Sequence, residues 1–405
     1  MGKALAFVLY CSLVLAGPVA HGQDGKALTS VPTEIPEPAA DGIIYLPGAS
    51  GAALATTINP ALQAHLTAFL IDSHAPIAAI VVADAHTGSI LAMAQGRRPE
   101  EWGGKSHSAL HAAFPAASVF KTVVTTAAFE IADFDGDVPL GLTGGCSHVR
   151  ETGDWLYEKE PTAVSRMSLR TAFGKSCNGF FAKIGVNHLG IGIITNFARR
   201  YGWETGVPAD FKMERSPFLP PVPQNSSTHT VGRFAAGFGK VGLSAAHAAY
   251  IMLSIANRGV PVPLRLFRNT ALPLPIEQRP RIFSEVTASR LSYILDASVR
   301  GGTASFAFRH GKYRKLHDLV GGKTGTLTGS APKGITTWFA GMAPVAAPEI
   351  VVASVVVLDE RWHIKAPNLA AEGFWAYFDD KVNQKAMNTA SFVPVAKIEN
   401  PKQTK

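Results

Sequence analysis

The chain has 405 residues, of which 47% are hydrophobic, so it can bury one large core or two modest ones. Its formal net charge of +8 comes from Lys and Arg scattered along the whole sequence. Because no basic block is interleaved with aromatic residues, the sequence lacks the pattern of a nucleic-acid groove, and no nucleic-acid partner is predicted. A mildly basic surface of this kind suits an anionic polymer.

The first 22 residues have the features of an export segment. Lys3 precedes an apolar run from Ala4 to Ala16, which is short for a membrane span, and Ala20 and Gly22 supply small residues ahead of a cleavage point. This pattern predicts a cleaved signal peptide, with an uncleaved N-terminal anchor as the alternative. In both cases we expect an exported protein of the periplasm or cell envelope.

The remaining chain divides by composition into three parts. Residues 23–55 are rich in Pro, Ala and Gly without helical or strand periodicity, which predicts a tether. Residues 56–380 carry the periodic segments and are expected to form one domain. Residues 381–405 are polar and rich in Lys, which is typical of a frayed tail.

Strand-like and helix-like segments alternate in blocks along the expected domain. A capped helix at 59–70 and an apolar hairpin at 78–93 come first, and three further strands are expected at 320–326, 336–342 and 350–358. Helices are predicted between and after them, at 182–189, 245–257, 284–299 and 369–378. Strands at both ends of the sequence with helices between them predict an α/β fold, an antiparallel sheet flanked by helices with an adjoining all-helical subdomain.

The stretch from Phe114 to Val124 holds the first candidate for chemistry. A proline at position 115 and a following apolar run predict a buried helix with Ser118 in its first turn and Lys121 one turn later. Residues three apart on a helix face the same side, so the hydroxyl and the amine can meet. A lysine whose pKa is lowered by burial can take the serine proton, which makes Ser118 a candidate nucleophile.

The same spacing occurs a second time in this chain. Ser330 and Lys333 also stand three apart, but Pro332 lies between them and no apolar helical run follows, which places this pair in a loop. We therefore expect Ser330 to have no catalytic role.

Of the three cysteines, Cys11 lies in the export segment. Cys146 and Cys177 remain, and an even pair in an oxidising compartment favours one disulfide, with two separate buried thiols as the alternative.

Two more short motifs follow the Ser118 segment. Ser176-Cys177-Asn178 comes before an apolar helix-like run, and Lys323-Thr324-Gly325 lies in an expected strand. Taken singly, the first fits a helix cap and the second an ordinary hairpin turn. All three in this order resemble the motifs of the penicillin-binding transpeptidases and serine β-lactamases. The resemblance extends over most of residues 56–378, including Gly302-Thr303-Ala304 ahead of the third motif.

The resemblance implies a role for each of these side chains. Ser118 attacks the carbonyl of a D-Ala-D-Ala stem-peptide terminus, with Lys121 as the base and Ser176 as the relay of a proton to the leaving amine. Lys323 supplies positive charge. Substrate binding falls to the residues whose amide, hydroxyl or small size suits a peptide, namely Asn178, Thr324, Gly325 and Thr326. The backbone N–H groups of Ser118 and Thr326 form the oxyanion hole.

Two positions depart from the family pattern. Ala117 stands where a glycine often precedes the nucleophile, and Phe238-Gly239 replaces the usual Gln-Gly. Neither change removes a functional group, so both are expected to be mild.

The resemblance favours a cell-wall D,D-transpeptidase, with peptidoglycan stem peptides and β-lactams as ligands and with wall-building proteins as candidate partners. A carboxypeptidase or endopeptidase on the same site is an alternative. A β-lactamase is less favoured because neither Glu204 nor Glu214 lies in the motif that supplies the deacylating base. A receptor that is acylated but only signals is the alternative from another class. The histidines show no metal-binding spacing, so no metal and no cofactor are predicted.

Overall fold

The computed structural model describes residues 29–96, 107–112, 114–143, 145–147, 149–156, 165–270, 275, 278–330, 332–358 and 364–379. The predicted export segment, the start of the predicted tether and the predicted C-terminal tail lie outside the described residues.

A five-stranded antiparallel sheet forms the centre of the fold, with strand order β10-β11-β12-β3-β4. Its strands are β3 (Ile77–Asp84), β4 (Ile90–Gln95), β10 (Gly321–Ser330), β11 (Lys333–Ala343) and β12 (Ile350–Leu358). Within this sheet, the strand that comes first in the sequence and the one that comes last therefore lie side by side, because β12 pairs with β3 along almost its whole length. The predicted hairpin and the three predicted late strands are confirmed.

Three helices cover the two faces of this sheet. The helices α1 (Pro60–Asp72) and α11 (Ala366–Phe378) pack on one face, and α7 (Ala245–Ala256) packs on the other. Side chains alternate between the faces, so Ile80 and Val82 join the cluster under α1 and α11 while Val81 joins the cluster under α7. β12 is buried over its whole length, as expected for a strand covered on both sides.

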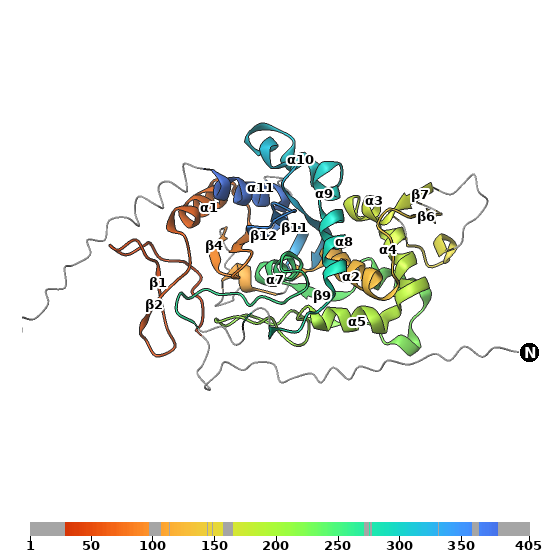
Figure 1. Ribbon diagram of the computed structural model, residues 1–405, viewed down its shortest axis with the longest axis horizontal. Coiled ribbons are helices and arrows are strands. Elements are labelled where there is room, and N and C mark those ends of the chain that lie inside the picture. The colour runs from red at the N-terminus through yellow and green to blue at the C-terminus, as the bar shows by residue number, and fades with distance from the viewer. Residues whose placement is uncertain are drawn as a thin grey trace, which may run out of the picture.

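The remaining helices form a block beside the sheet (Figure 1). They are α2 (Lys121–Ile131), α3 (Leu169–Gly174), α4 (Asn178–Ile184), α5 (Gly190–Arg200), α6 (Thr228–Ala235), α8 (Glu285–Leu295) and α9 (Ala297–Arg300). The exception is α10 (Ser305–Phe308), which packs against α11 with Phe308 in the apolar cluster under α1 and α11. The short strands are β1 (Tyr45–Pro47), β2 (Ala53–Ala55), β5 (Phe114–Pro115), β6 (Pro139–Leu142), β7 (Ser165–Ser168), β8 (Phe218–Leu219) and β9 (Lys240–Leu243). The expected fold class, a sheet flanked by helices with a helical subdomain at its side, is the one observed.

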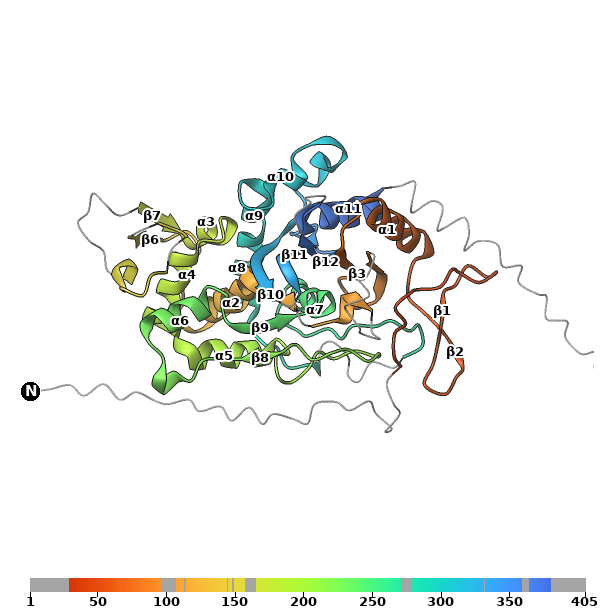
Figure 2. The ribbon, with the colours of Figure 1, turned by 180° about the vertical axis from the view of Figure 1, so that it is seen from behind.

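The helix α2 joins the two parts of the molecule. Residues 121–129 are all buried, and the view from behind places α2 between β10 and the helical block (Figure 2). Its side chains belong to the same apolar cluster as Val81 of the sheet and Phe181 of the helical block. A functional group at the start of α2 is consequently held by both halves of the fold.

Two expected elements differ in detail. Asp296 interrupts the helix expected at 284–299, so that α8 ends at Leu295 and α9 begins at Ala297. The helix expected from residue 182 starts earlier, at Asn178, and ends in a π-helical turn.

The segment expected to be a tether is packed in its described part. Strands β1 and β2 pair with each other, and Val31, Ile44 and Leu46 are buried in the main apolar cluster. Thr56 continues this attachment through a hydrogen bond from its hydroxyl to the Ile44 carbonyl, 2.8 Å. The expectation of a tether is wrong for these residues. Their packing depends on three isolated apolar side chains, which form no periodic pattern in the sequence.

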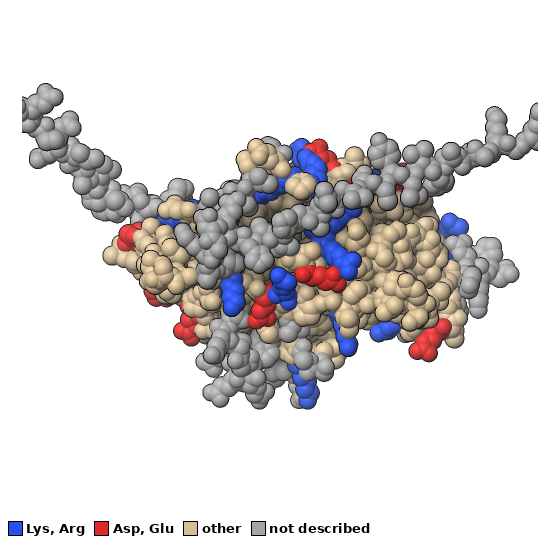
Figure 3. Space-filling model, turned by 90° about the horizontal axis from the view of Figure 1, so that it is seen from below, with Lys and Arg blue, Asp and Glu red and all other residues tan. Residues whose placement is uncertain are grey.

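On the face seen in Figure 3, Lys and Arg side chains alternate with Asp and Glu over a mostly uncharged surface. Within the described part of the chain, no helix is both long enough and apolar enough to cross a membrane.

Candidate active site

The loop into α2 places the predicted nucleophile at the junction of sheet and helices. Residues Ala117–Phe120 form a 3-10 turn directly before α2, so Ser118 lies in this turn rather than in the helix proper. Lys121 is the first residue of α2, and its side-chain nitrogen lies 2.8 Å from the Ser118 hydroxyl oxygen. The expected meeting of the two side chains is therefore present, on a tighter turn than an α-helix provides.

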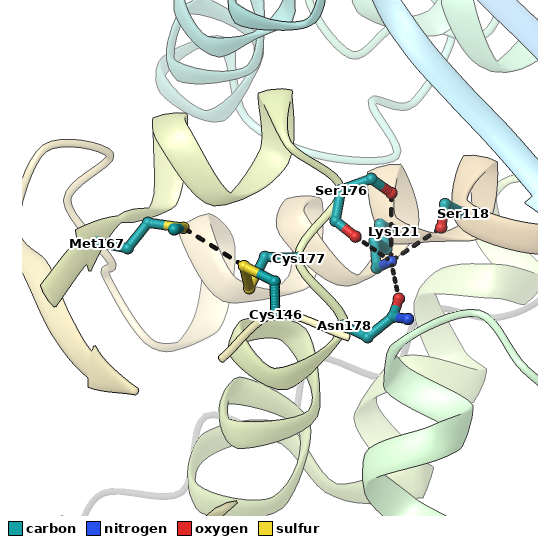
Figure 4. The surroundings of a disulfide bond; sticks show 7 residues. All are labelled: Ser118, Lys121, Cys146, Met167, Ser176, Cys177 and Asn178. Carbon is teal, nitrogen blue, oxygen red and sulfur yellow. Dashed lines mark hydrogen bonds between the residues drawn. A yellow bond between two sulfur atoms is a disulfide. The ribbon is translucent and has the colours of Figure 1, made fainter. Parts of the chain in front are cut away.

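Lys121 is also the centre of a wider hydrogen-bond network (Figure 4). Its nitrogen donates to the Asn178 side-chain oxygen at 2.6 Å, to the Ser176 carbonyl at 3.1 Å and to the Ser176 hydroxyl at 3.3 Å. Four oxygen atoms from two motifs thus surround one buried nitrogen.

The second motif is shaped by an uncommon backbone conformation. Ser176 has a positive φ of 55°, and the chain then enters α4 at Asn178 with Cys177 as N-cap. A non-glycine residue in the left-handed region is rare and costs of the order of 1 kcal/mol or more, so surrounding contacts must hold it. This turn aims both Ser176 and Asn178 at Lys121.

A disulfide next to this turn supplies such a constraint. Cys146 and Cys177 are bonded, with their Cα atoms 4.5 Å apart, and the Gly179 N–H donates to the Cys146 carbonyl at 3.2 Å. Because Cys177 separates Ser176 from Asn178, the bridge fixes the middle of the motif (Figure 4). The disulfide prediction is confirmed.

The third motif lies on the edge strand β10, facing the Ser118 turn. Lys323 donates to the Thr324 carbonyl at 3.0 Å and is fully buried. Gly325 allows a close approach, since a Cβ placed there would lie 3.3 Å from the Ala117 Cβ and 3.2 Å from that of Trp338. The Trp338 indole also donates to the Pro115 carbonyl at 2.8 Å, which ties β11 to the loop before Ser118.

Burial of both lysines changes their protonation. Desolvation lowers the pKa of Lys323 to about 7. The pKa of Lys121 is lowered well below its usual range, first by burial and second by the positive charge of Lys323. A lysine with these surroundings loses its proton much more readily than one in water, which suits a base beside a serine.

A cavity of about 320 Å³ opens in front of these groups. Its described lining residues are Ala117, Ser118, Ser176, Asn178, Ala236, Gly237, Phe238, Thr303, Phe306, Thr324, Gly325, Thr326, Leu327, Thr337, Trp338, Lys365 and Pro367. Six of the eight predicted site residues are in this set, while Lys121 and Lys323 lie behind the wall with no exposed surface. Not one Asp or Glu is among the described lining residues.

Several lining residues were not predicted as site residues. Thr303 contacts the Thr324 hydroxyl through its own hydroxyl and donates to the Gly174 carbonyl at 3.2 Å. Phe306 and Lys365 also line the cavity, with the Lys365 nitrogen 5.6 Å from the Phe306 ring centre. Thr303 lies between α9 and α10, Phe306 in α10 and Lys365 directly before α11. No local sequence pattern shows that these residues line one cavity, although Thr303 lies in a stretch that resembles the family.

The second serine-lysine pair with the same spacing, Ser330 and Lys333, lies in a different structural setting. Ser330, the last residue of β10, is paired with Lys333, the first residue of β11. The expected loop is thus part of a strand hairpin, and neither residue lies in a helix. Among the described residues, no group of three or more His, Cys, Asp or Glu side chains is placed to hold a metal ion.

A serine that is hydrogen-bonded to a buried lysine, together with a second serine and a second lysine on a sheet edge, forms a candidate active site of the serine-lysine type. Residues 78–372 match the family described as the penicillin binding protein transpeptidase domain, and the chain belongs to this family.

Two curated relatives match at low sequence identity. The chain is 25% identical over 342 residues to the peptidoglycan D,D-transpeptidase PbpA of Mycobacterium tuberculosis, covering 74% of this chain and 66% of PbpA. It is 26% identical to the penicillin-binding protein PbpB of Mycolicibacterium smegmatis, covering 72% of this chain and 46% of PbpB. The chain therefore spans less than two thirds of the length of either curated relative.

Solved structures agree in fold. Pseudomonas aeruginosa PBP2 in complex with WCK 5153 superposes with a TM-score of 0.65 at 20% identity, covering 81% of this chain and 79% of that one. The transpeptidase domain of Burkholderia pseudomallei penicillin-binding protein 3 gives a TM-score of 0.64 at 22% identity, covering 84% and 98%. At these identities the similarity establishes the shared fold.

Proposed function

We propose that this protein is a serine-type D,D-transpeptidase that cross-links peptidoglycan stem peptides ending in D-Ala-D-Ala. The observation that carries the proposal is the position of Lys121, whose buried nitrogen contacts Ser118, Ser176 and Asn178 at once. The family membership and the naming of the relative PbpA as a peptidoglycan D,D-transpeptidase support it.

In the first half-reaction, Ser118 Oγ attacks the carbonyl of the penultimate D-Ala. Its proton passes to the neutral amine of Lys121, 2.8 Å away. The peptide C–N bond then breaks, and the leaving D-Ala amine receives a proton from Lys121 through the Ser176 hydroxyl. The backbone N–H groups of Ser118 and Thr326 stabilise the oxyanion, an effect worth a few kcal/mol at other acyl-transfer sites.

The strand β10 binds the peptide during this step. The hydroxyls of Thr324 and Thr326, which line the cavity, bind the terminal carboxylate of the substrate, and the charge of protonated Lys323, buried behind the cavity wall, attracts it. Gly325 lets the substrate backbone lie against the strand, and the Asn178 amide holds both the peptide and Lys121.

In the second half-reaction, an amine of another stem peptide attacks the Ser118 ester. The new C–N bond forms as the C–O bond to Ser118 breaks, and the proton of the amine returns to Ser118 Oγ through Lys121. A carboxypeptidase or endopeptidase would use water as the acceptor on the same site. A β-lactamase or a non-catalytic β-lactam receptor would share only the acylation step.

The same site would be acylated by β-lactams, a proposal supported by the structure of penicillin binding protein 3 from Mycobacterium tuberculosis in complex with aztreonam, which has the same fold. Such a function places the domain outside the cytoplasm, in agreement with the export segment predicted for the first 22 residues. Wall-building proteins are its expected partners.

Intact-protein mass spectrometry after exposure to penicillin tests the proposal. One covalent adduct per chain is expected, located on Ser118 by peptide mapping. Ser118→Ala should abolish the adduct and Ser330→Ala, at the end of β10, should retain it. An adduct on another serine, or none, would falsify the assignment.

A further inference from the structure

A second, smaller cavity lies between α3 and α9, which both ribbon views place next to each other (Figures 1 and 2). Its volume is about 180 Å³. It is lined by Arg170, Thr171, Gly174, Lys175, Ala297, Arg300, Gly301 and Gly302. This cleft therefore carries three basic side chains, and none of its described lining residues is acidic.

One carboxylate orients two of these cations. Asp296 accepts from the Arg170 guanidinium at 2.7 Å through one oxygen and from the Arg300 guanidinium at 2.8 Å through the other. Arg300 also reaches Asp318 at the rim, 3.2 Å away. Lys175 is exposed and forms no ion pair with any described residue. The positive charges of Arg170, Lys175 and Arg300 therefore outnumber the negative charges of Asp296 and of the largely solvated Asp318. The cleft keeps a positive potential.

Only a thin backbone wall separates this cleft from the active-site cavity. Lys175 lines the cleft, and the next residue, Ser176, lines the active-site cavity. Likewise, Gly302 lines the cleft and Thr303 lines the active-site cavity. The Gly174 carbonyl accepts from the Thr303 N–H at 3.0 Å and closes the wall. A Cβ on Gly302 would lie 2.2 Å from that carbonyl oxygen, so the two segments touch directly.

The wall stands on the side of the leaving group. Thr303 contacts Thr324, one of the two hydroxyls proposed to bind the terminal carboxylate of the donor peptide. An acceptor amine must replace the leaving amine at the same carbonyl carbon. The rest of the acceptor molecule then extends past Thr324 and Thr303 toward the positive cleft.

We propose that the cleft formed by Arg170, Lys175 and Arg300 binds a carboxylate of the acceptor stem peptide and so directs that peptide, rather than water, to the Ser118 ester. This inference rests on the proposed transpeptidase function and adds to it the site for the second substrate. Arg170 and Arg300 provide directed hydrogen bonds, while Lys175 provides a mobile charge.

The test measures the ratio in which the acyl-enzyme transfers its acyl group to an amine acceptor or is hydrolysed by water. The purified protein is supplied with a synthetic peptide thioester donor and one of two acceptors, N-acetyl-D-Glu-L-Lys amide or N-acetyl-D-Gln-L-Lys amide. These acceptors present the same amine and differ in one distal carboxylate. Because the ratio of transfer to hydrolysis is taken after acylation, changes in the acylation rate do not affect it.

We expect the wild-type protein to favour the D-Glu acceptor by about three- to fivefold, the range of an exposed ion pair. Lys175→Glu and Arg300→Glu should abolish or invert this preference, and Lys175→Gln should reduce it. Lys212→Glu is the control, because it changes the charge by the same amount at a residue that is exposed and lines neither cavity. A penicillin adduct on each variant verifies that its active site is folded.

Two outcomes would overturn the inference in different ways. Equal transfer to both acceptors by the wild-type protein, or an unchanged preference in both charge-reversed variants, would reject the cleft while leaving the transpeptidase function intact. Hydrolysis of the donor without transfer to either amine would reject both together.

Discussion

The side-chain nitrogen of Lys121 lies 2.8 Å from the Ser118 hydroxyl oxygen, and Lys121 has no solvent-exposed surface. Burial lowers the pKa of this lysine, so a neutral amine is available to accept the serine proton. Lys121→Arg replaces it by a guanidinium that stays protonated. We expect the rate of penicillin acylation to fall by about 10²- to 10⁴-fold, the usual contribution of a general base.

A time course of adduct formation by mass spectrometry measures this rate. The matched control is Lys333→Arg at the start of β11, which should acylate as fast as the wild-type protein. A Lys121→Arg variant with an unchanged rate would mean that another group takes the proton.

The second prediction concerns the pH dependence of acylation. Lys121 must be neutral to act as base, so the rate rises with pH on the acidic side as it loses its proton. Lys323, with its pKa lowered to about 7, loses its charge as the pH rises above that value. Capture of the penicillin carboxylate then weakens, and the second-order rate constant should fall on the alkaline side.

Stopped-flow measurement of the acylation rate constant between pH 5 and pH 10 gives this profile. Because Lys121 and Lys323 interact, the two apparent pKa values of the profile describe the pair and not either lysine alone. Lys323→Gln should lower the whole profile and remove its alkaline limb. An alkaline limb that persists in this variant would assign it to a different group.

Much of the fold could be predicted because the deciding signals are local. Alternating or continuous apolar runs indicated β3, β4 and β12, and Asn59 indeed caps α1 by accepting from the Leu62 N–H at 3.1 Å. The three motifs likewise gave the identity of the site residues, since residue type and order carry the resemblance.

The sequence could not indicate features that depend on distant contacts. The positive φ values of Ala117 and Ser176, 48° and 55°, are imposed by the packing of the Ser118 turn and the disulfide-linked loop. The first value also gives a physical reason for the glycine often found at position 117, which adopts this conformation without strain. Thr303 and the cleft beside it arise where segments over a hundred residues apart meet.

The third prediction is that the disulfide stabilises the protein and its second motif. The bridge links residues 31 apart, for which the chain-entropy model gives about 3–4 kcal/mol. The double variant Cys146→Ala, Cys177→Ala should lose about that much free energy of unfolding in urea. Acylation should also slow, because Cys177 lies between Ser176 and Asn178.

Reductant provides the matched comparison for this prediction. It should lower the stability of the wild-type protein toward that of the double variant and leave the variant unaffected. A wild-type protein whose unfolding is insensitive to reductant would contradict the role of the bridge.

The fourth prediction compares two glycines that both have positive φ. A Cβ at Gly237 would lie 2.3 Å from the Ala117 carbonyl oxygen, whereas a Cβ at Gly239 meets nothing within 4 Å. Both Gly→Ala changes strain the backbone by about 1–2 kcal/mol. Only Gly237→Ala also pushes on the peptide before Ser118.

We therefore expect Gly237→Ala to be less stable than Gly239→Ala and to acylate more slowly, while Gly239→Ala loses stability alone. Thermal unfolding and penicillin labelling of the two variants measure both effects. Equal acylation rates would show that the position of the Ser118 turn tolerates this contact.

The last prediction is that a β-lactam adduct on this protein is long-lived. Acylation requires Ser118 and its base, but release requires a water molecule with a base of its own. Glu204 is paired with Arg199 at 2.6 Å, and Glu214 is paired with His111 at 2.9 Å. Neither glutamate lines the active-site cavity, and no Asp or Glu is among its described lining residues.

Hydrolysis of the adduct should consequently be slower than acylation by orders of magnitude, since each 1.4 kcal/mol of missing stabilisation is about tenfold in rate. Stopped-flow kinetics with nitrocefin should give a burst of one equivalent, absent in Ser118→Ala, followed by almost no turnover. Sustained turnover of several molecules per second would instead identify the protein as a β-lactamase and would require a base outside the described lining of the cavity.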